Sequence, residues 1–415
     1  MYTYKIGISK EEHDNFIKNS SQTNLLQSSS WAKVKDEWGN ERMGFYQDSK
    51  LVASASILIR PLPLGMTMFY IPRGPVMNYQ DKDLVNFVLT SLKKFAKRKR
   101  ALFIKFDPFI LLNHHQINEE AINNPQAQTI IDTLKHLGCE WLGQTSDMGE
   151  TIQPRFQANI YAEGFSEANL SKKIRQSIRT AKNKGVSIRF GGYELLADFS
   201  DLMKKTEDRK SIHLRGIDYY RKLLDNYPQH SFITLASLNL KERLTKLESQ
   251  RKKAQNNLAK FGDNVKPSKI DNTKKEIERL SDEIAFLQEH LSQGKDTVPL
   301  SGTLSLEFGK TSENVYAGMD DEFRRYQAAI YTWFATANHA FERGNHWQNM
   351  GGIENNLSGG LYNFKSKFKP EIEEFIGEFN LPVSPLYKLA NIAYTIRKKR
   401  RSKHFNNGFT KHLSK

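Results

Sequence analysis

The hydrophobic pattern of residues 240–291 differs from that of the chain on either side. Apolar residues recur there mostly three or four positions apart in two runs, which are Leu240, Leu244, Leu247, Ala254, Leu258 and Phe261, and then Ile270, Ile277, Leu280, Ile284, Leu287 and Leu291. Such runs are typical of helices that pack through a heptad seam. Between them, GDNVKPSK contains a glycine and a proline that stop a helix. The pattern predicts an antiparallel coiled-coil arm over residues 239–295, with its seam buried within the hairpin and its ends inserted in another domain.

Outside this arm, strand-like and helical patterns occur twice in the same order. The first set reads strand, strand, helix and strand, at 51–60, 68–75, 83–100 and 101–108. The second set has the same assignments, at 298–308, 314–321, 328–344 and 346–352. Helical patterns precede the strands in both halves, at 28–38, 193–209 and 217–227. The constant offset of about 245 residues predicts two copies of one α/β unit. The alternative is chance recurrence of a common pattern.

Length and composition narrow the class of protein. A chain of 415 residues fits two or three domains. The single cysteine, Cys139, excludes an internal disulfide framework and fits a reducing compartment. No signal-peptide pattern and no apolar run long enough to cross a bilayer is visible. We therefore expect a soluble cytoplasmic protein.

The net charge of +16 is unevenly distributed. Residues 171–185 contain Lys and Arg but no acid, and no Asp or Glu follows Glu378. The tail carries the basic cluster 397–401, after apolar residues that can line one helix face, at Leu386, Leu389, Ile392 and Ile396. Such segments favour nucleic acid or an anionic membrane surface. A solubilising face and a disordered tail are the alternative.

The basic stretch has the spacing of an amphipathic helix. Its cations fall three, four and three positions apart, at Lys172, Arg175, Arg179 and Lys182, and its apolar residues mark the opposite face, at Ile174, Ile178 and Ala181. Gly185 ends the helix. A cationic stripe without acids is suited to following a phosphate backbone, so we expect these four residues to bind nucleic acid.

The order of elements in each copy resembles the acetyltransferase-like (GNAT) fold. The predicted fold class is therefore α/β, with two tandem GNAT-like domains and the inserted coiled-coil arm. GNAT proteins bind coenzyme A phosphates on a Gly-rich turn of the form [RQ]-x-x-G-x-[GA]. The nearest match, QNMGGI at 348–353, fails at its last position. Coenzyme A is therefore poorly supported.

Several segments together resemble the Fem/MurM family of tRNA-dependent aminoacyltransferases of peptidoglycan synthesis. They are LLQSSSWAKVKDEW (25–38), FYIPRGPV (69–76), IKFDP (104–108), TIQPRFQANI (151–160), KKIRQSIRTAKNKG (172–185), HLRGIDYY (213–220), YAGMDDEFRRY (316–326) and GGLYNFKSKF (359–368). The resemblance covers essentially the whole chain and is greatest to the streptococcal MurM and MurN branch. It divides the chain into residues 1–153, 154–383, the arm 239–295 within the second domain, and a basic C-terminal helix and tail at 384–415.

The resemblance implies a reaction. An amino acid, alanine or serine, would pass from aminoacyl-tRNA to the stem-peptide lysine of a lipid-linked peptidoglycan precursor, or to the first branch residue already on that lysine. The donor ester is already activated, so no cofactor, metal or covalent nucleophile is implied. The partners would be aminoacyl-tRNA, the lipid-linked precursor and the anionic inner face of the plasma membrane, where the protein would be peripheral.

The resemblance also assigns roles to individual residues. Lys35 and Arg215 match the family's substrate-binding Lys and Arg and would hold the precursor's diphosphate, with Trp38 and Tyr219 beside them. Phe364 and Lys365 match a Phe-Lys pair near the tRNA acceptor end, where an aromatic ring can stack an unpaired base and a cation can hold its phosphate. Without the resemblance, Lys35 would be an ordinary surface lysine, and Trp38 and Phe364 would be core residues.

Asp107 is the best candidate for a catalytic carboxylate. It ends an apolar strand, and the family places an acidic residue of the KFDP type in its substrate groove. Aminolysis needs a neutral amine, and a lysine amine has a pKa near ~10.4, so the site must desolvate it or supply a base. The alternatives are that Asp107 only orients the amine or that it forms a strand-end Asp-Pro turn.

Two other functions compete with this one. An acyl-CoA-dependent N-acyltransferase could use the same fold, although its phosphate-binding turn is not found. A non-catalytic tRNA- or membrane-binding protein could use the basic segments and the arm.

Overall fold

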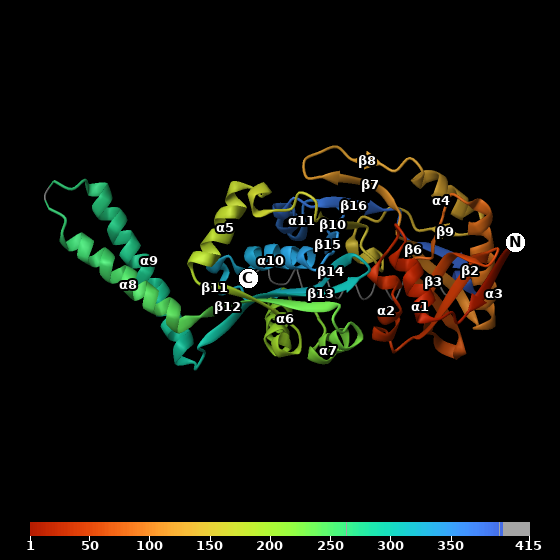
Figure 1. Ribbon diagram of the computed structural model, residues 1–415, viewed down its shortest axis with the longest axis horizontal. Helices are drawn as coiled ribbons and strands as arrows, with labels where there is room; N and C mark the ends of the chain where they lie inside the picture. The colour runs from red at the N-terminus through yellow and green to blue at the C-terminus, as the bar shows by residue number, and fades with distance from the viewer. Residues whose placement is uncertain (263, 390, 393–415) are drawn as a thin grey trace.

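Two β-sheets lie next to each other along the long axis of the molecule, and a helical arm projects from one end (Figure 1). The computed structural model describes residues 1–262, 264–389 and 391–392. Its first sheet contains, in order, β1 (Tyr2–Ile6), β2 (Gly39–Gln47), β3 (Lys50–Pro61), β4 (Thr67–Arg73), β6 (Ala101–Pro108), β17 (Phe379–Pro382) and β9 (Glu140–Trp141), with β5 (Val76–Met77) on β3. Its helices are α1 (Lys10–Lys18), α2 (Ser29–Val34), α3 (Lys82–Arg98) and α4 (Ala127–His136).

The second sheet is built on the same plan. It contains, in order, β11 (Val186–Gly191), β12 (Ser231–Asn239), β13 (Thr297–Phe308), β14 (Thr311–Met319), β15 (Trp347–Ile353), β10 (Phe156–Tyr161), β16 (Glu371–Phe375), β7 (Leu111–Gln116) and β8 (Ile122–Asn123). Its helices are α5 (Lys172–Asn183), α6 (Leu196–Lys210), α7 (Ile217–Asn226), α10 (Ala328–Glu342) and α11 (Gly360–Lys365). One buried core lies within each half, and a third is shared, because Ile17 and Val34 of α1 and α2 pack against α6 and α7.

The two copies expected from the sequence are present element by element. The order β3, β4, α3, β6 in the first half matches β13, β14, α10, β15 in the second. In both, the first two strands pair antiparallel, and the helix crosses over to a parallel partner. A parallel pair needs such a crossover, and a helix with one apolar face supplies it. The GNAT-like fold class is thereby confirmed.

The parallel strand pairs of the two copies differ in one respect that bears on function. In the first copy, β4 and β6 stay paired from Thr67↔Ala101 to Arg73↔Pro108. In the second, β14 and β15 pair only from Thr311↔Trp347 to Glu313↔Asn349, and then part. The first pair is closed along its length, whereas the second is open beyond its third residue pair.

Within the described residues the chain passes between the sheets four times, from β6 to β7, β8 to β9, β9 to β10 and β16 to β17, and the first and last of these crossings lie side by side. After β6 it continues into β7, which pairs with β16 of the second sheet, and after β16 it returns to β17, which pairs with β6 of the first. The crossing segments are bonded to each other through the Ile376 amide and the Ile110 carbonyl, at 3.0 Å. The predicted domain boundaries at 153/154 and 383/384 do not include this exchange of strands between the sheets. Hydrophobic patterns in the sequence locate the strands, but they do not indicate which strands pair.

The arm is a pair of antiparallel helices, α8 (Leu240–Ala259) and α9 (Pro267–Ser292), inserted between β12 and β13 (Figure 1). Its inner seam residues Leu247 and Ile284 are fully buried, but they share a core with Phe323 and Tyr326 of the body. The expectation that the seam is satisfied within the hairpin is therefore wrong for its inner half. The outer seam is only half-buried, because only the two helices cover it there.

A buried ion pair joins the two helices at the base of the arm, and a tyrosine of the second domain binds to it. Arg243 of α8 donates to the Glu283 carboxylate of α9 at 2.7 Å, and the Tyr326 hydroxyl donates to the same oxygen at 2.9 Å. Both charged side chains are almost completely buried. Burial alone would raise the pKa of Glu283, but the Arg243 guanidinium lowers it, with a net lowering.

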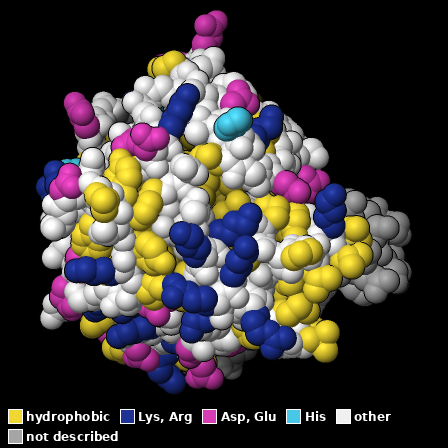
Figure 2. All heavy atoms as spheres, turned by 90° about the vertical axis from the view of Figure 1, so that its right-hand side faces the viewer, with side chains coloured by type: hydrophobic (Ala, Val, Ile, Leu, Met, Phe, Trp, Pro, Cys, Tyr) yellow, Lys and Arg dark blue, Asp and Glu magenta, His cyan; other side chains and the backbone are white. Residues whose placement is uncertain are grey.

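Positive charge is more widespread on the surface than the two basic segments suggest. The end of the molecule that carries the first sheet shows a group of Lys and Arg side chains at its centre, with Asp and Glu mostly toward the margins (Figure 2). Among the described residues, Leu386, Leu389 and Ile392 are exposed, whereas Ile396 and the basic cluster 397–401 lie outside them. None of the described helices is long and apolar enough to cross a bilayer.

Candidate active site

Lys35 and Tyr219 meet where α2 packs against α7. Lys35 caps the C-terminal end of α2, and Tyr219 lies in the first turn of α7. Lys35 Nζ donates to the Tyr219 hydroxyl at 3.0 Å and lies 4.8 Å from the centre of the Trp31 ring. Burial, with a further contribution from the Arg215 charge, lowers the pKa of Lys35 to about 8. This lysine is thus desolvated and held in place, unlike an ordinary surface lysine.

Arg215 completes a cationic and aromatic patch with Lys35 and Tyr219. Its guanidinium lies 4.8 Å from the centre of the Tyr219 ring, and Tyr316 of β14 meets the same ring edge-on at 6.1 Å. Arg215 is exposed, and neither cation forms an ion pair with another described residue. Two cations without a direct ion-pair partner among the described residues, one of them with a planar guanidinium, can bind a phosphate or diphosphate group. The fold thus brings together three residues predicted to bind substrate.

Trp38, the fourth predicted substrate-binding residue, lies apart from this patch. It packs beside the buried core residues Leu58 and Met68, and Arg60 covers its ring at 5.4 Å. These contacts are those of a partly buried core residue. A direct role of Trp38 in binding substrate remains a prediction.

Asp107 lies at the end of β6, where the chain crosses to the second sheet, and is buried. One carboxylate oxygen accepts from the Tyr70 hydroxyl at 2.8 Å and the other from the Arg73 amide at 2.6 Å. Burial raises the pKa of Asp107 to about 7, against the opposing effect of the Arg73 charge. A carboxyl group with this pKa can accept or release a proton at neutral pH. It can equally orient its neighbours, so both predicted roles are open to it.

Arg73 and Glu378 are parts of this centre that the sequence reasoning did not single out. The Arg73 guanidinium lies 3.9 Å from the centre of the Phe375 ring and donates to the Pro154 carbonyl at 3.1 Å. Glu378, in the returning crossing segment, forms a buried ion pair with Lys105 at 2.9 Å. The available signal was Arg73 within the matched segment FYIPRGPV, but its partners are distant in sequence.

Lys365 lies at the open strand pair of the second copy. Its side chain is 5% exposed, and Nζ donates to the Gly352 carbonyl of β15 at 2.7 Å. Gly351 beside it has a φ of 84°, a left-handed backbone conformation that favours glycine. Burial lowers the pKa of Lys365 to about 7. The amine is therefore poised between its charged and neutral forms beside the gap between β14 and β15.

Phe364 packs inside the second domain. Its ring meets Trp333 and Phe368 edge-on, at 5.7 Å in each case. Stacking of a tRNA base on Phe364, or a phosphate contact by Lys365, would require these internal contacts to change. Both tRNA-binding roles remain predictions.

The basic helix α5 has the predicted two faces. Its four cations Lys172, Arg175, Arg179 and Lys182 are exposed, and Ile174, Ile178 and Ala181 are buried. Lys182 pairs with Glu167 at 3.1 Å, so the stripe is partly neutralised at its C-terminal end. The other three cations form no ion pair with a described residue. The described residues also contain no group of His, Cys, Asp and Glu suited to a metal ion.

These features define a transferase built from two GNAT-like units, one with a closed strand pair and one with an open pair next to a buried lysine. The chain belongs to the FemAB family, whose model matches residues 8–395. The predicted family is thereby confirmed, and with it the enzyme class, an aminoacyltransferase. The narrower resemblance to the streptococcal branch stays a prediction.

Relatives and a solved structure agree with this assignment over most of the chain. The chain is 27% identical over 409 residues to the lipid II:glycine glycyltransferase of Staphylococcus aureus (strain USA300), covering 93% of this chain and 94% of the relative. It is 28% identical over 406 residues to the enzyme of that name from Staphylococcus saprophyticus, with the same coverage. The crystal structure of FemX matches with a TM-score of 0.71 at 25% identity, covering 93% of this chain and 99% of FemX.

Proposed function

We propose that this protein transfers an amino acid from aminoacyl-tRNA to a peptide amine of lipid-linked peptidoglycan precursor, and so builds the interpeptide bridge. The observation that carries the proposal is the patch of Lys35, Arg215 and Tyr219, which provides cations for a diphosphate in a chain of the FemAB family. The names of its relatives, lipid II:glycine glycyltransferases, support a lipid-linked acceptor.

The chemistry of the proposed reaction requires little beyond positioning. The donor ester is activated, so correct placement of the amine can supply ~7–11 kcal/mol of the barrier. Negative charge develops on the ester carbonyl oxygen during attack, and a fixed donor stabilises it. Lys365 Nζ, which now donates to the Gly352 carbonyl beside the gap between β14 and β15, would serve as that donor. Asp107 would orient the amine or accept its proton.

Two surfaces are proposed for the macromolecular partners. The exposed cations Lys172, Arg175 and Arg179 of α5 would follow the tRNA backbone, which makes binding salt-dependent. The exposed Leu386 and Leu389 would contact the inner face of the plasma membrane, which holds the lipid-linked precursor. Binding to anionic vesicles and not to neutral ones would test this contact.

A coenzyme A donor has little support. QNMGGI lies within and around strand β15 and not on a turn before a helix, where phosphates are usually bound. The segment before α10 instead carries Asp320, which pairs with Lys205, and Asp321, which pairs with Arg324. This segment, DDEFRRYQ at 320–327, contains no glycine and so does not provide a Gly-rich phosphate-binding turn.

The deciding experiment supplies the purified protein with lipid-linked precursor and alanyl-, seryl- or glycyl-tRNA, followed by mass spectrometry of the precursor. One added residue, dependent on the tRNA, is expected. Alanine and serine are the amino acids predicted from the sequence. Glycyl-tRNA is tested as well, because the relatives are named glycyltransferases. Acceptor with and without a first branch residue distinguishes the two positions. Transfer from acetyl-CoA, with none from any aminoacyl-tRNA, would overturn the proposal.

A further inference from the structure

The loop between β3 and β4 is apolar and exposed. These antiparallel strands pair up to Pro61↔Thr67, so residues 62–66, LPLGM, form the loop and include the short helix η2 (Pro63–Gly65). The loop contains no polar side chain, although loops that face water are normally rich in Asn, Asp and Ser as well as Gly and Pro. Leu64, at its tip, is 83% exposed.

Leu64 also has a backbone conformation that leucine rarely adopts. Its φ and ψ are 61° and 25°, in the left-handed region, and Gly65 follows with a φ of 67°. Glycine and asparagine are favoured in this region, because a larger side chain crowds the backbone. Leucine at this position thus costs backbone energy and gains almost no burial within the chain. This combination indicates an apolar contact outside the chain.

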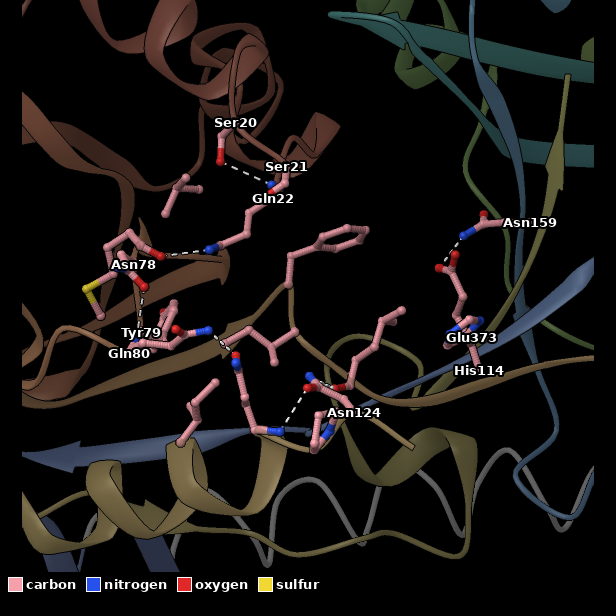
Figure 3. A pocket seen from close by; sticks show the side chains of 18 of the residues that line it. Ser20, Ser21, Gln22, Asn78, Tyr79, Gln80, His114, Asn124, Asn159 and Glu373 are labelled. Atoms are coloured by element: carbon pink, nitrogen blue, oxygen red, sulfur yellow. Dashed lines mark hydrogen bonds between the residues drawn. The ribbon is translucent and has the colours of Figure 1, made fainter. Parts of the chain in front are cut away.

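The loop does not close the large cavity of the protein. A cavity of about 990 Å³ lies between the two sheets, where Gln22 and Gln80 lie on one side and Asn159 and Glu373 on the other (Figure 3). None of residues 62–66 lines it. The apolar side chains of the loop therefore do not serve as a lid over this cavity.

Positive charge accompanies the loop. The Arg100 guanidinium donates to the Leu64 carbonyl at 3.3 Å. Arg100 is the last of four consecutive exposed cations, KRKR at 97–100, and residues 84–106 contain no acid. None of the four cations forms an ion pair with a described residue. Their charge is therefore available to an anionic partner.

The loop adjoins the exposed leucines near the end of the described chain. Leu62 and Met66, at the two ends of the loop, pack against the small core that contains Tyr387. Leu386 and Leu389, on either side of Tyr387, are 51% and 69% exposed. Exposed leucines from two distant parts of the sequence are thus attached to the same core.

An anionic lipid bilayer fits this surface better than a protein or a nucleic acid does. Apolar side chains that enter the acyl region, beside cations that stay at the headgroups, are typical of proteins that bind the membrane surface. A stable protein interface needs ~800 Å² from each partner, far more than a five-residue loop provides. Nucleic acid would account for the cations but not for the exposed Leu64.

We propose that the loop 62–66 inserts Leu64 into the apolar region of an anionic bilayer, while the cations of 97–100 bind the lipid headgroups. The first domain would then have a membrane-binding element of its own, in addition to the contact proposed for Leu386 and Leu389.

The position of the loop also orients the diphosphate patch. Trp38 packs against the same core as Leu62, and the Trp38 amide donates to the Lys35 carbonyl at 2.9 Å. Insertion of the loop would thus hold Lys35 near the bilayer surface, where a diphosphate can reach it while the attached lipid stays in the membrane. This orientation rests on the proposed function, whereas insertion of the loop does not.

The first test compares Leu64→Asn with the wild type in binding to vesicles of phosphatidylglycerol and phosphatidylcholine, without tRNA or precursor. Asparagine tolerates the left-handed conformation, so the melting temperature should be equal or higher. Vesicle affinity should fall about tenfold or more, as for the loss of a buried leucine side chain. Ile122→Asn, at a 62% exposed isoleucine of β8, is the matched control and should bind like the wild type.

The second test locates the loop directly. Leu64→Cys is labelled with a polarity-sensitive dye, and the single native cysteine, Cys139, is buried and should not react. The emission should shift to the blue on anionic vesicles, whereas the same dye on Ile122→Cys should not shift.

The third test concerns the cations. Lys99→Gln should weaken binding to anionic vesicles roughly fivefold, as for the loss of one cation near the surface. Lys269→Gln on the arm is the matched control, since each ammonium lies over a phenylalanine ring, and it should bind these vesicles like the wild type.

The outcomes separate the bilayer from other partners. No blue shift at position 64, or equal vesicle affinity of Leu64→Asn and the wild type, would overturn the proposal. Weaker tRNA binding by Lys99→Gln, with vesicle binding unchanged, would assign the cations to nucleic acid instead. Because vesicle binding needs neither tRNA nor precursor, its failure leaves transfer to a water-soluble precursor standing, and an inactive transfer assay leaves the insertion of the loop standing.

Discussion

The depressed pKa of Lys35 makes precursor binding depend on pH in a direction that can be calculated. With a pKa of about 8, the free protein's Lys35 is about 90% protonated at pH 7 and about 10% protonated at pH 9. A bound diphosphate requires the charged form, so binding at pH 9 must also supply the protonation free energy. We expect the dissociation constant to rise about tenfold between pH 7 and pH 9, which is ~1.4 kcal/mol.

The assay is titration of a water-soluble, diphosphate-linked precursor analogue at pH 7, 8 and 9. Lys35→Arg should remove the dependence, because a guanidinium stays charged throughout this range. Lys222→Arg is the matched control, since Lys222 lies on α7 and pairs with Asp36, and it should keep the wild-type slope.

The pH dependence of stability that Lys35 causes cannot account for the expected weakening of precursor binding between pH 7 and pH 9. A lysine whose pKa is lower in the folded state binds fewer protons there, so its contribution to the unfolding free energy rises with pH between about 8 and the unfolded value near ~10.4. Stability from Lys35 therefore increases over the upper part of the range in which binding weakens. An unchanged dissociation constant from pH 7 to pH 9, or the same slope in Lys35→Arg, would refute the proposed role of this residue.

Three further predictions concern the arm and the buried lysine. Arg243→Met leaves the Glu283 charge buried without its partner and should lower the unfolding free energy in urea by about 3–5 kcal/mol; a loss below ~1 kcal/mol would show that the pair is not effectively buried. Replacing residues 251–279, the outer part of the arm, by a short linker should leave the melting temperature nearly unchanged and weaken tRNA binding. Replacing residues 241–294, the whole arm, should expose the core that it shares with the body and lower the melting temperature. Equal melting temperatures of the two shortened proteins would contradict this prediction. Lys365→Met should flatten the rise of unfolding free energy between pH 7 and pH 10, because the folded wild type binds fewer protons there than the unfolded chain; an unchanged slope would contradict its depressed pKa.

Local pattern sufficed to predict most of the elements. The strands and helices of both copies occur where apolar periodicity places them, and the arm's helices occupy 240–259 and 267–292 of the predicted 239–295. These features depend on residues close together in sequence. The faces of α5 follow from the same short-range spacing, which is why its buried and exposed residues were predicted correctly.

The exchange of strands between the sheets could not be predicted in this way. Strands such as β17 and β6 pair although they are more than two hundred residues apart in the sequence. Nothing in the local sequence of either strand indicates this partner. The same limit hid the surroundings of Asp107, since Arg73, Pro154 and Phe375 meet only after the β9–β10 and β16–β17 crossings have formed. The tRNA role of Lys365 comes from the resemblance, which matches it to a Phe-Lys pair near the tRNA acceptor end, and no local pattern predicted that its stem is buried beneath β15.

The difference between the closed and the open strand pair suggests that the two GNAT-like units have different roles in the reaction. A closed pair such as β4 and β6 leaves no gap for an acyl group between its strands, whereas β14 and β15 part after Glu313 and Asn349. Gln27 of the short helix η1 (Leu25–Gln27) donates to the Pro72 carbonyl near the end of β4 at 2.6 Å, and the Leu25 backbone amide bonds to the Glu313 carboxyl group, so η1 connects the end of the closed pair to the point where the other pair opens. We infer that the second unit holds the donor ester and the first presents the acceptor amine across this junction, so that the amine can attack the ester directly and no covalent enzyme intermediate is required.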